Sequence, residues 1–277
     1  MKLLIDVGNT RAKVAWMSAG DTDRQTPVTA LDADCLPTLA AHLPHRPQAI
    51  LGSNVAGLHI RRQWDQACHA AWGLTVRWCD ARDGLALLHN PYADPARLGA
   101  DRWLGLLGLL PRLAADPGWR AGHAALLASF GTATTIDTLL PGDAGTLPAF
   151  LGGLILPGPS LMADSLNQGT AQLPLSAGQL TDFPQNTHDA IASGIAAAQA
   201  GALLHQWHLA RQRTQGRAPL VFVCGGAWPS VRAAIQEGLA QTQAAASLPP
   251  RPPCHLDGPV LDGLACLSLA EGPTQAN

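Results

Sequence analysis

Short apolar runs, separated by glycine-rich or polar turns, recur along the chain and predict a mixed α/β protein. The first run, Leu3-Leu4-Ile5, ends at Asp6 and is followed by a turn at residues 7–10. The alternation of apolar and polar positions on both sides of this turn predicts two strands within residues 1–16. Gly8 can adopt a positive φ at little cost, so we expect it to provide the turn geometry of a hairpin.

The rest of the chain continues with strands and helices of ordinary length. A break at Asp116-Pro117-Gly118 is expected to separate two domains, residues 1–118 and 119–277. Further strands are predicted at residues 49–55, 74–78, 124–128, 132–139, 152–158 (strand and turn) and 220–224, and helices at 59–72, 103–113, 187–207 and 262–269.

The two halves of the chain share a sequence pattern. The segment Leu127-Ala128-Ser129-Phe130-Gly131-Thr132 repeats the apolar run, polar residue and glycine turn of the N-terminus. Ser129 stands in this copy where the first copy has Asp6. Because each copy opens a half in which helices follow strands, the repeat predicts a duplicated α/β architecture.

Composition limits the class of function. The chain has 277 residues, of which 47% are hydrophobic and 14% are charged, as in a globular protein with a sizeable core. Its net charge of −2 provides no basic surface for nucleic acid. Asp6 interrupts the first apolar run too early for a signal peptide, and Pro111 ends the run from Trp103 too early for a membrane span. We therefore expect a cytoplasmic protein that binds neither nucleic acid nor membrane.

Missing residue types and motifs exclude several classes of enzyme. The six cysteines are scattered without a CxxC pair, so they are expected to be buried thiols and not zinc ligands. The only lysines, Lys2 and Lys13, lie outside any GxxxxGK frame, which excludes a P-loop. The chain also has no GxGxxG and no GxSxG motif. Since Glu237 and Glu271 are the only glutamates, a catalytic carboxylate is expected to be an aspartate.

The segment from Asp6 to Lys13 is the first candidate for chemistry. Gly8 and Asn9 allow backbone N–H groups to point into one concavity, as phosphate binding requires. Asp6 at a strand end could hold Mg²⁺ directly or through water, and Lys13 could reach a phosphate oxygen. The same residues also fit an ordinary turn in which Asp6 accepts hydrogen bonds from local N–H groups. The residues of this segment leave both interpretations open.

Two further segments have both a functional and a structural interpretation. Asp101 lies at a predicted helix start, where it could cap the helix or accept a proton from an attacking hydroxyl, as an aspartate does in many kinases. Arg102 beside it could neutralise a carboxylate or a phosphate. Gly225-Gly226 after a buried strand could admit the flat base of a nucleotide or form a strand-to-helix turn.

A series of motifs spans nearly the whole chain. In order, they are Asp6-x-Gly8-Asn9-Thr10-x-x-Lys13, Asn90-Pro91-Tyr92, Leu98-Gly99-Ala100-Asp101-Arg102, Gly131-Thr132-Ala133-Thr134-Thr135-x-Asp137, Gly152-Gly153-x-Ile155-x-Pro157-Gly158 and Thr187-x-x-Ala190-Ile191-x-x-Gly194. In this order they resemble the type III pantothenate kinases, and in particular the Bordetella-type members once called Bvg accessory factor. The resemblance implies the fold of the acetate and sugar kinase/Hsp70/actin superfamily, in which two duplicated ribonuclease H-like domains have a cleft for ATP between them.

The resemblance also implies an activity and a set of residue roles. The expected reaction is transfer of the γ-phosphoryl group of ATP to the primary hydroxyl of pantothenate, giving 4'-phosphopantothenate, the first step of coenzyme A biosynthesis. Asp101 would accept the proton. The residues implied to bind ATP are Asp6, Val7, Gly8, Asn9, Thr10, Arg11, Ala12, Lys13 and Thr132, with Gly225-Gly226 on the adenosine side, and those implied to bind pantothenate are Tyr92, Gly99, Ala100, Asp101, Arg102 and Thr187.

Cofactors and oligomeric state follow from the same resemblance. Members of the family are homodimers that need Mg²⁺, for which Asp6 is the implied ligand, and a monovalent cation, K⁺ or NH₄⁺. Many members have an aspartate where this chain has Ser129. Because a neutral hydroxyl is a weaker cation ligand than a carboxylate, we expect no metal role for Ser129 and leave the monovalent cation unassigned.

Two alternatives to an active pantothenate kinase stay open. The first is a non-catalytic or regulatory relative that binds ATP or pantothenate and acts through a partner, an interpretation that Ser129 motivates. The second is a kinase of the same superfamily that acts on another small hydroxy acid or sugar. Arg102 and Thr187 favour a polar acceptor that carries a carboxylate, and the presence of both Asp6 and Asp101 favours catalysis.

Overall fold

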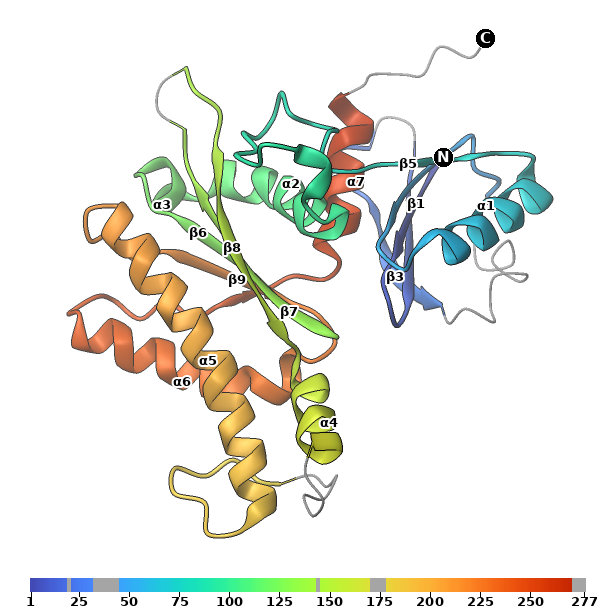
Figure 1. Cartoon of the computed structure of the whole chain (residues 1–277). Helices are drawn as coiled ribbons and strands as arrows, with labels where there is room; N and C mark the ends of the chain where they lie inside the picture. The colour runs from blue at the N-terminus through green and yellow to red at the C-terminus, as the bar shows by residue number, and fades with distance from the viewer. Residues whose placement is uncertain (19–20, 32–44, 143–144, 170–177, 271–277) are drawn as a thin grey trace. The chain divides into compact units, whose positions relative to one another are not determined.

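The computed structural model describes residues 1–18, 21–31, 45–142, 145–169 and 178–270 (Figure 1). The chain divides into two compact units, each with one five-stranded sheet. The first unit comprises Met1–Ala115, Asp143–Ala149 and Asp257–Asn277, and the second comprises Asp116–Gly142 and Phe150–Leu256. The first segment of the first unit ends at Ala115, close to the break expected at residues 116–118. The C-terminal helix, which we expected in the second domain, belongs to the first unit.

The first unit is a mixed sheet with its associated helices. Its central strand β1 pairs antiparallel with β2 and parallel with β4, and the strand order is β3-β2-β1-β4-β5. Its elements are β1 (Lys2–Val7), β2 (Ala12–Met17), β3 (Gln25–Leu31), β4 (Ala49–Asn54), α1 (Leu58–Trp72), β5 (Val76–Trp78), the 3₁₀ turn η2 (Pro95–Arg97), α2 (Ala100–Ala115) and α7 (Pro259–Ala270).

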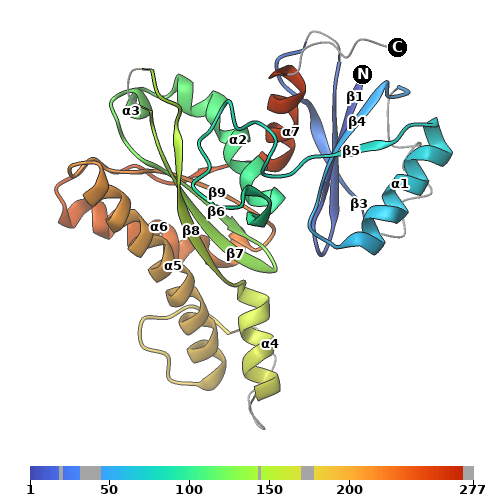
Figure 2. The same cartoon turned by 45° about the horizontal axis from the view of Figure 1, so that its top comes forward.

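The two faces of the first sheet carry different side chains. Alternate residues of β1 from Leu3 to Val7 are buried in one apolar cluster with Trp64 and Trp72 of α1, which lies along the sheet in Figure 2. The side chain of Asp6 therefore points to the opposite face. On that side α2 and α7 pack against the strands of the same unit.

The second unit repeats the topology of the first. Its central strand β6 pairs antiparallel with β7 and parallel with β9, and the strand order is β10-β9-β6-β7-β8. Read from its other edge, the second sheet has the order β8-β7-β6-β9-β10, which matches β3-β2-β1-β4-β5 of the first sheet strand by strand. The predicted duplication is therefore confirmed. The elements are α3 (Pro117–Arg120), β6 (Ala125–Phe130), β7 (Ala133–Leu140), β8 (Ala149–Pro157), α4 (Pro159–Gly169), α5 (Thr187–Arg213), β9 (Leu220–Cys224), α6 (Trp228–Ala245) and β10 (Cys254–His255).

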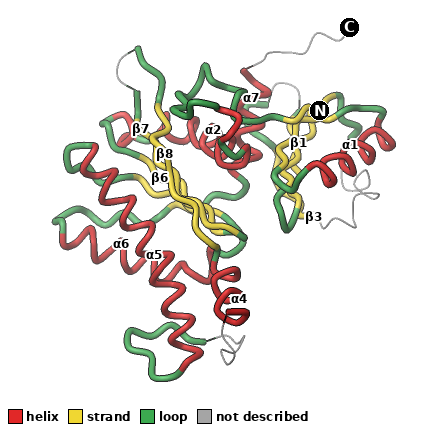
Figure 3. Tube along the Cα trace, in the orientation of Figure 1, coloured by secondary structure: helices red, strands yellow, loops and turns green. Residues whose placement is uncertain are grey.

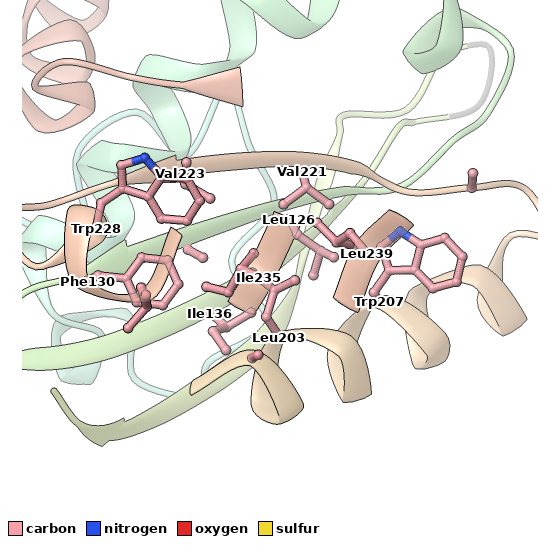
Figure 4. Close-up of a cluster of buried hydrophobic side chains, with 14 residues drawn as sticks. Leu126, Phe130, Ile136, Leu203, Trp207, Val221, Val223, Trp228, Ile235 and Leu239 are labelled. Atoms are coloured by element: carbon pink, nitrogen blue, oxygen red, sulfur yellow. The ribbon is translucent and has the colours of Figure 1, made fainter. Parts of the chain in front are cut away.

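The core of the second unit lies between its twisted sheet, drawn in yellow in Figure 3, and the helices α5 and α6. Figure 4 shows Phe130 and Ile136 of the sheet gathered with Leu203 of α5 and Ile235 of α6, and all four side chains are fully buried. Burial of each such side chain contributes about 1.5–3 kcal/mol. This cluster therefore fixes β6 and β7, the two strands that carry the second glycine turn.

The helices α2 and α7 cross at two glycines. A Cβ atom on Gly108 of α2 would lie 2.1 Å from the carbonyl oxygen of Pro259, and one on Gly263 of α7 would lie 2.0 Å from that of Leu104. The two helices therefore touch through their backbones. This contact fixes the position of α2, whose first turn carries Asp101. Within the described residues, no helix combines the length and the apolar character needed to cross a bilayer.

We expect Gly263→Ala to destabilise the protein by about 1–3 kcal/mol, because the added methyl group must push α2 away from α7. Gly201→Ala is the matched control, since Gly201 lies in α5 and an added Cβ there meets no atom within 4 Å. Alanine at that position should stabilise the protein by up to about 1 kcal/mol. Urea unfolding followed by circular dichroism measures both variants, and effects of the same sign would contradict the backbone contact.

Candidate active site

The first hairpin joins β1 to β2 through residues 8–11. Val7 pairs with Ala12, and the Gly8 N–H donates a hydrogen bond to the Arg11 carbonyl oxygen at 3.1 Å. The expectation that Gly8 adopts a positive φ is wrong. A Cβ atom on Gly8 would lie only 3.2 Å from the same carbonyl oxygen, so glycine instead allows the two ends of the loop to approach closely.

Asp6 lies near the end of β1 and has polar neighbours on both adjacent strands. It pairs in register with Lys13 of β2 and with Ser53 of β4. Residues paired in this way point to the same face of a sheet. The half-buried Asp6 side chain is therefore flanked by an ammonium group on one side and by a buried hydroxyl on the other.

Burial and charge act on Asp6 in opposite directions. Burial raises the pKa of Asp6 from 3.8 to about 7, the charge of Lys13 lowers it, and the charge of Asp101 raises it further. The helix α2, whose first turn carries Asp101, packs against β4, the strand beside β1 in the first sheet. Two carboxylates that repel each other in one buried place are suited to a cation, which would relieve the repulsion.

Asp101 lies in the first turn of α2 and is half-buried. Its Oδ1 accepts a hydrogen bond from the Arg102 backbone N–H at 2.8 Å, so the side chain satisfies one N–H group of the helix start. A Cβ atom on Gly99 would lie 2.8 Å from the same oxygen. Glycine at position 99 therefore leaves room for the carboxylate at the helix start, and the hydrogen bond fixes its orientation.

Arg102 and Tyr92 extend the cluster around Asp101. The Arg102 side chain is buried, with 8% of the residue exposed, and its Nη1 lies 3.5 Å from the Tyr92 hydroxyl. The Tyr92 N–H donates to the side-chain oxygen of Asn90 at 3.0 Å, which orders the loop before η2. The structure thus brings Tyr92, Gly99, Asp101 and Arg102, all expected to bind pantothenate, into one unit and onto consecutive segments.

The second hairpin is one residue shorter than the first. Phe130 pairs with Thr134, and the Gly131 N–H donates to the Ala133 carbonyl oxygen at 3.1 Å, which leaves Thr132 alone at the tip. Thr132 is exposed there. Thr132 therefore lies on the surface of the second unit, at the tip of its hairpin.

Two glycines from other elements support this second hairpin. The Gly158 N–H donates to the Thr132 carbonyl oxygen at 2.9 Å. Gly225 has a φ of 98°, and a Cβ atom there would lie 2.2 Å from the Phe130 carbonyl oxygen, so the strand-to-helix turn accounts for this glycine. Gly226 is exposed with no atom within 4 Å of an added Cβ, which leaves space for a flat group beside it.

Ser129 takes the place in β6 that Asp6 takes in β1. It is half-buried, and its partners in register are Thr135 of β7 and Cys224 of β9, both neutral. The carboxylate of this strand pair, Asp137, lies opposite Leu127. No carboxylate of these strands therefore stands in register with Ser129 to take the place of a missing aspartate.

Thr187 is the first residue of α5 and is exposed. The preceding residue, Asn186, caps the helix, since its side-chain oxygen accepts a hydrogen bond from the Asp189 N–H at 3.0 Å. Because Asn186 already serves as the cap, the Thr187 hydroxyl is not required for the helix start.

A divalent cation at Asp6 would have few protein ligands. Throughout the ranges that the structure describes, no three histidine, cysteine, aspartate or glutamate side chains gather as a metal site. Mg²⁺ usually binds through one or two carboxylates and completes its shell with substrate phosphates and water. Asp6, as a single carboxylate ligand, fits that mode of binding.

Comparison with known proteins finds relatives along nearly the whole chain. The model of the family described as type III pantothenate kinase matches residues 2–209. The chain is 49% identical to the type III pantothenate kinase of Bordetella bronchiseptica, covering 99% of this chain and 100% of that protein. It is 38% identical to that of Cupriavidus pinatubonensis, covering 84% and 90%. A solved structure described as a Baf family transcriptional activator from Campylobacter jejuni matches with a TM-score of 0.55 at 17% identity, over 97% and 98% of the two chains, and bears on the fold alone.

Proposed function

Since this chain belongs to the type III pantothenate kinase family, we propose that Asp101 is the base and Asp6 the phosphate-side carboxylate of its kinase site. The enzyme transfers the γ-phosphoryl group of ATP to the primary hydroxyl of pantothenate and so begins coenzyme A biosynthesis. One observation carries the assignment of the two residues. The helix α2, whose first turn carries Asp101, packs against β4, the neighbour of β1, and the charge of Asp101 raises the pKa of Asp6, which supports placing both carboxylates in one site.

In the proposed reaction, the hydroxyl oxygen of pantothenate attacks the γ-phosphorus while the bond from that phosphorus to the bridging oxygen breaks, and ADP leaves. The hydroxyl proton passes to Asp101. Because the Arg102 N–H holds Oδ1 of Asp101, Oδ2 is the oxygen assigned to accept the proton.

We assign pantothenate to the segment that contains Tyr92 and residues 99–102. Arg102 is buried and its Nη1 lies 3.5 Å from the Tyr92 hydroxyl, so its guanidinium can pair with a carboxylate or with charge that develops on the phosphoryl group. The loss of water around it strengthens such a pair. Thr187, exposed at the start of α5, is the residue of the second unit that we assign to the same substrate.

We assign ATP to residues 6–13 and to Thr132, with Gly226 beside the adenosine. The loop at residues 8–11 is short and held by its own hydrogen bond, so its backbone is preorganised for phosphate oxygens. Lys13, in register with Asp6, supplies a positive charge at the same level. Asp6 would hold Mg²⁺, which when bound would offset the charge of the phosphates.

A direct test uses purified protein with ATP, Mg²⁺ and pantothenate. ADP release that depends on pantothenate, together with a product heavier by one phosphoryl group, is the expected result. A panel of other small hydroxy acids and sugars distinguishes the alternative acceptor. Thermal stabilisation by ATP or pantothenate without product would instead support the non-catalytic relative. Growth of a strain that lacks pantothenate kinase, restored by this chain, tests the same activity in cells.

We also propose that the protein is a homodimer that associates through the second unit. Ile155 of β8 is 64% exposed and Phe183 is 88% exposed, and Leu151 of β8 and Leu161 of α4 are exposed as well. Large apolar side chains exposed on an edge strand and on the helix that follows it, as Leu151, Ile155 and Leu161 are, are typical of protein interfaces. A second copy of the chain would cover them.

Ile155→Asp is expected to convert this dimer to a monomer, because a charge in the centre of an apolar interface must be desolvated. Leu209→Asp is the matched control, since Leu209 is 44% exposed on α5 and is not part of this surface. Sedimentation velocity measures the mass of each variant. A dimer that survives Ile155→Asp would contradict the assigned surface.

The monovalent cation and the cellular location are two further proposals. We assign no monovalent cation to Ser129, because the residue and its partners in register, Thr135 and Cys224, carry no charge. We propose a cytoplasmic location, because the reaction consumes ATP, and cell fractionation tests it.

A further inference from the structure

The hydroxyl of Ser53 is buried without a partner. Ser53 lies in β4 and is 0% exposed, and its Oγ has no hydrogen bond to any residue that the structure describes. A buried hydroxyl without a partner destabilises a protein, because it has lost its hydrogen bonds to water and gained none. Alanine would fill nearly the same space without that loss. The serine therefore needs an explanation outside the packing of the free protein.

The register of the first sheet places this hydroxyl beside Asp6. In the parallel pairing of β1 with β4, Leu4 lies opposite Leu51 and Asp6 lies opposite Ser53. Neighbouring strands are about 4.8 Å apart, so the two polar side chains are within reach of each other. The leucine pair at the preceding level is buried and apolar. On the face of the sheet that carries Leu4 and Leu51, Asp6 and Ser53 therefore form the polar pair at the end of these two strands.

The Asp6 carboxylate is available to such a donor. The charges of Lys13 and Asp101 and the burial of Asp6 act on its pKa, and no hydrogen bond contributes among the described residues. A carboxylate that holds a metal ion usually has a second hydrogen-bond partner that fixes its orientation. Ser53 is placed in register to serve as that partner, whereas Lys13 on the other side is the residue assigned to phosphate.

We propose that Ser53 is a positioning residue for Asp6, whose carboxylate accepts a hydrogen bond from the Ser53 hydroxyl when the Mg²⁺–nucleotide complex is bound. The inference rests on the proposed role of Asp6. Its physical basis is the strength of a hydrogen bond to an ionised group in a buried place. The hydroxyl can rotate to donate to the carboxylate without any change in the backbone of β4.

Titration of the protein with Mg²⁺–ADP, followed by calorimetry, tests this without any turnover. Ser53→Ala should weaken binding by about tenfold, as expected for loss of one hydrogen bond to a charged group. Ser268→Ala is the matched control, because Ser268 of α7 is also buried in the first unit with an unpartnered Oγ. It should bind like the wild type. With EDTA in place of Mg²⁺, Ser53→Ala and the wild type should bind ADP equally.

Two further measurements separate a positioning role from a structural one. The melting temperature of the free Ser53→Ala protein should equal or exceed that of the wild type, since an unpartnered hydroxyl has been removed. In an Asp6→Asn background, Ser53→Ala should cause no additional loss of Mg²⁺–ADP binding. Binding by Ser53→Ala equal to that of the wild type, or an equal loss in both backgrounds, would overturn the inference. Failure of the proposed function appears separately, as a protein that binds Mg²⁺–ADP but does not phosphorylate pantothenate.

Discussion

Asp101→Asn is expected to lower kcat by about 10²- to 10⁴-fold, the usual contribution of a general base. Asparagine has the shape of aspartate, and its side-chain oxygen can still accept the hydrogen bond from the Arg102 N–H that is 2.8 Å long in this structure. The start of α2 should therefore stay intact. What the variant loses is the ability to take the proton of the pantothenate hydroxyl. Initial rates of ADP release at saturating ATP and pantothenate measure the effect.

The specificity of this prediction can be checked with a second aspartate nearby. Asp94 caps η2 by accepting a hydrogen bond from the Ala96 N–H at 3.1 Å, a role that asparagine performs equally well. Asp94→Asn should therefore keep the turnover and the melting temperature of the wild type. Full activity in Asp101→Asn would rule out Asp101 as the base. A similar loss in both variants would show that the loop before α2 had been disturbed instead.

Asp6→Asn should reduce kcat/KM for Mg²⁺–ATP by more than about 100-fold. Replacing a residue that only orients a metal ligand already costs up to about 100-fold, and Asp6 is assigned as the ligand itself. It should at the same time stabilise the free protein at pH 8. The pKa of Asp6 is raised from 3.8 to about 7, so between these values the folded protein holds a proton that the unfolded chain has lost. Stability therefore falls as the pH rises from about 4 to 7, and the full penalty is present at pH 8. Asparagine is neutral at every pH, so the Asp6→Asn protein does not have this penalty in its free energy of unfolding.

The expected gain at pH 8 is on the order of 2–4 kcal/mol, and it should vanish near pH 4, where Asp6 is neutral in the wild type as well. Urea unfolding of both proteins at several pH values, without nucleotide or Mg²⁺, measures this difference. Asp21→Asn is a suitable contrast. A hydrogen bond from Gln25 lowers the pKa of Asp21, so its replacement should not stabilise the protein. A gain for Asp6→Asn that does not change with pH would contradict a buried, destabilised carboxylate.

The architecture could largely be predicted from local patterns. Both glycine hairpins and the buried strands β4 and β9 follow from apolar runs that end in turns, and α1, α2, α5 and α7 follow from helical periodicity. The helix α6 was missed although its buried residues Trp228, Val231, Ile235 and Leu239 have helical spacing. Alanines and glutamine between them dilute that signal. β3 and α4 also lacked a clear pattern, and the place of α7 in the first unit depends on contacts across the whole chain.

The site could be predicted only in part, for a similar reason. The motif around Asp6 and the motif around Asp101 are separate in the sequence, and their nearness depends on how α2 packs in the first unit. Ser53 lies in the strand that the sequence predicts at residues 49–55, and both it and Asn54 are polar, but only the register of β1 with β4 places Ser53 opposite Asp6. Its neighbour Asn54 gave the same signal and has a local role, since its side-chain amide donates to the Gly57 carbonyl oxygen at 3.1 Å.

The last helix of the chain has a consequence for the order of events during synthesis. α7 contacts α2 backbone to backbone, and its Asp262 forms a mostly buried ion pair with Arg24 of the N-terminal segment at 2.6 Å. The half that contains Asp6 and Asp101 therefore lacks one of its helices until residues 259–270 have left the ribosome. The second unit needs only residues up to Leu256 and can be complete earlier. In this protein the half that is translated first is the half that is finished last.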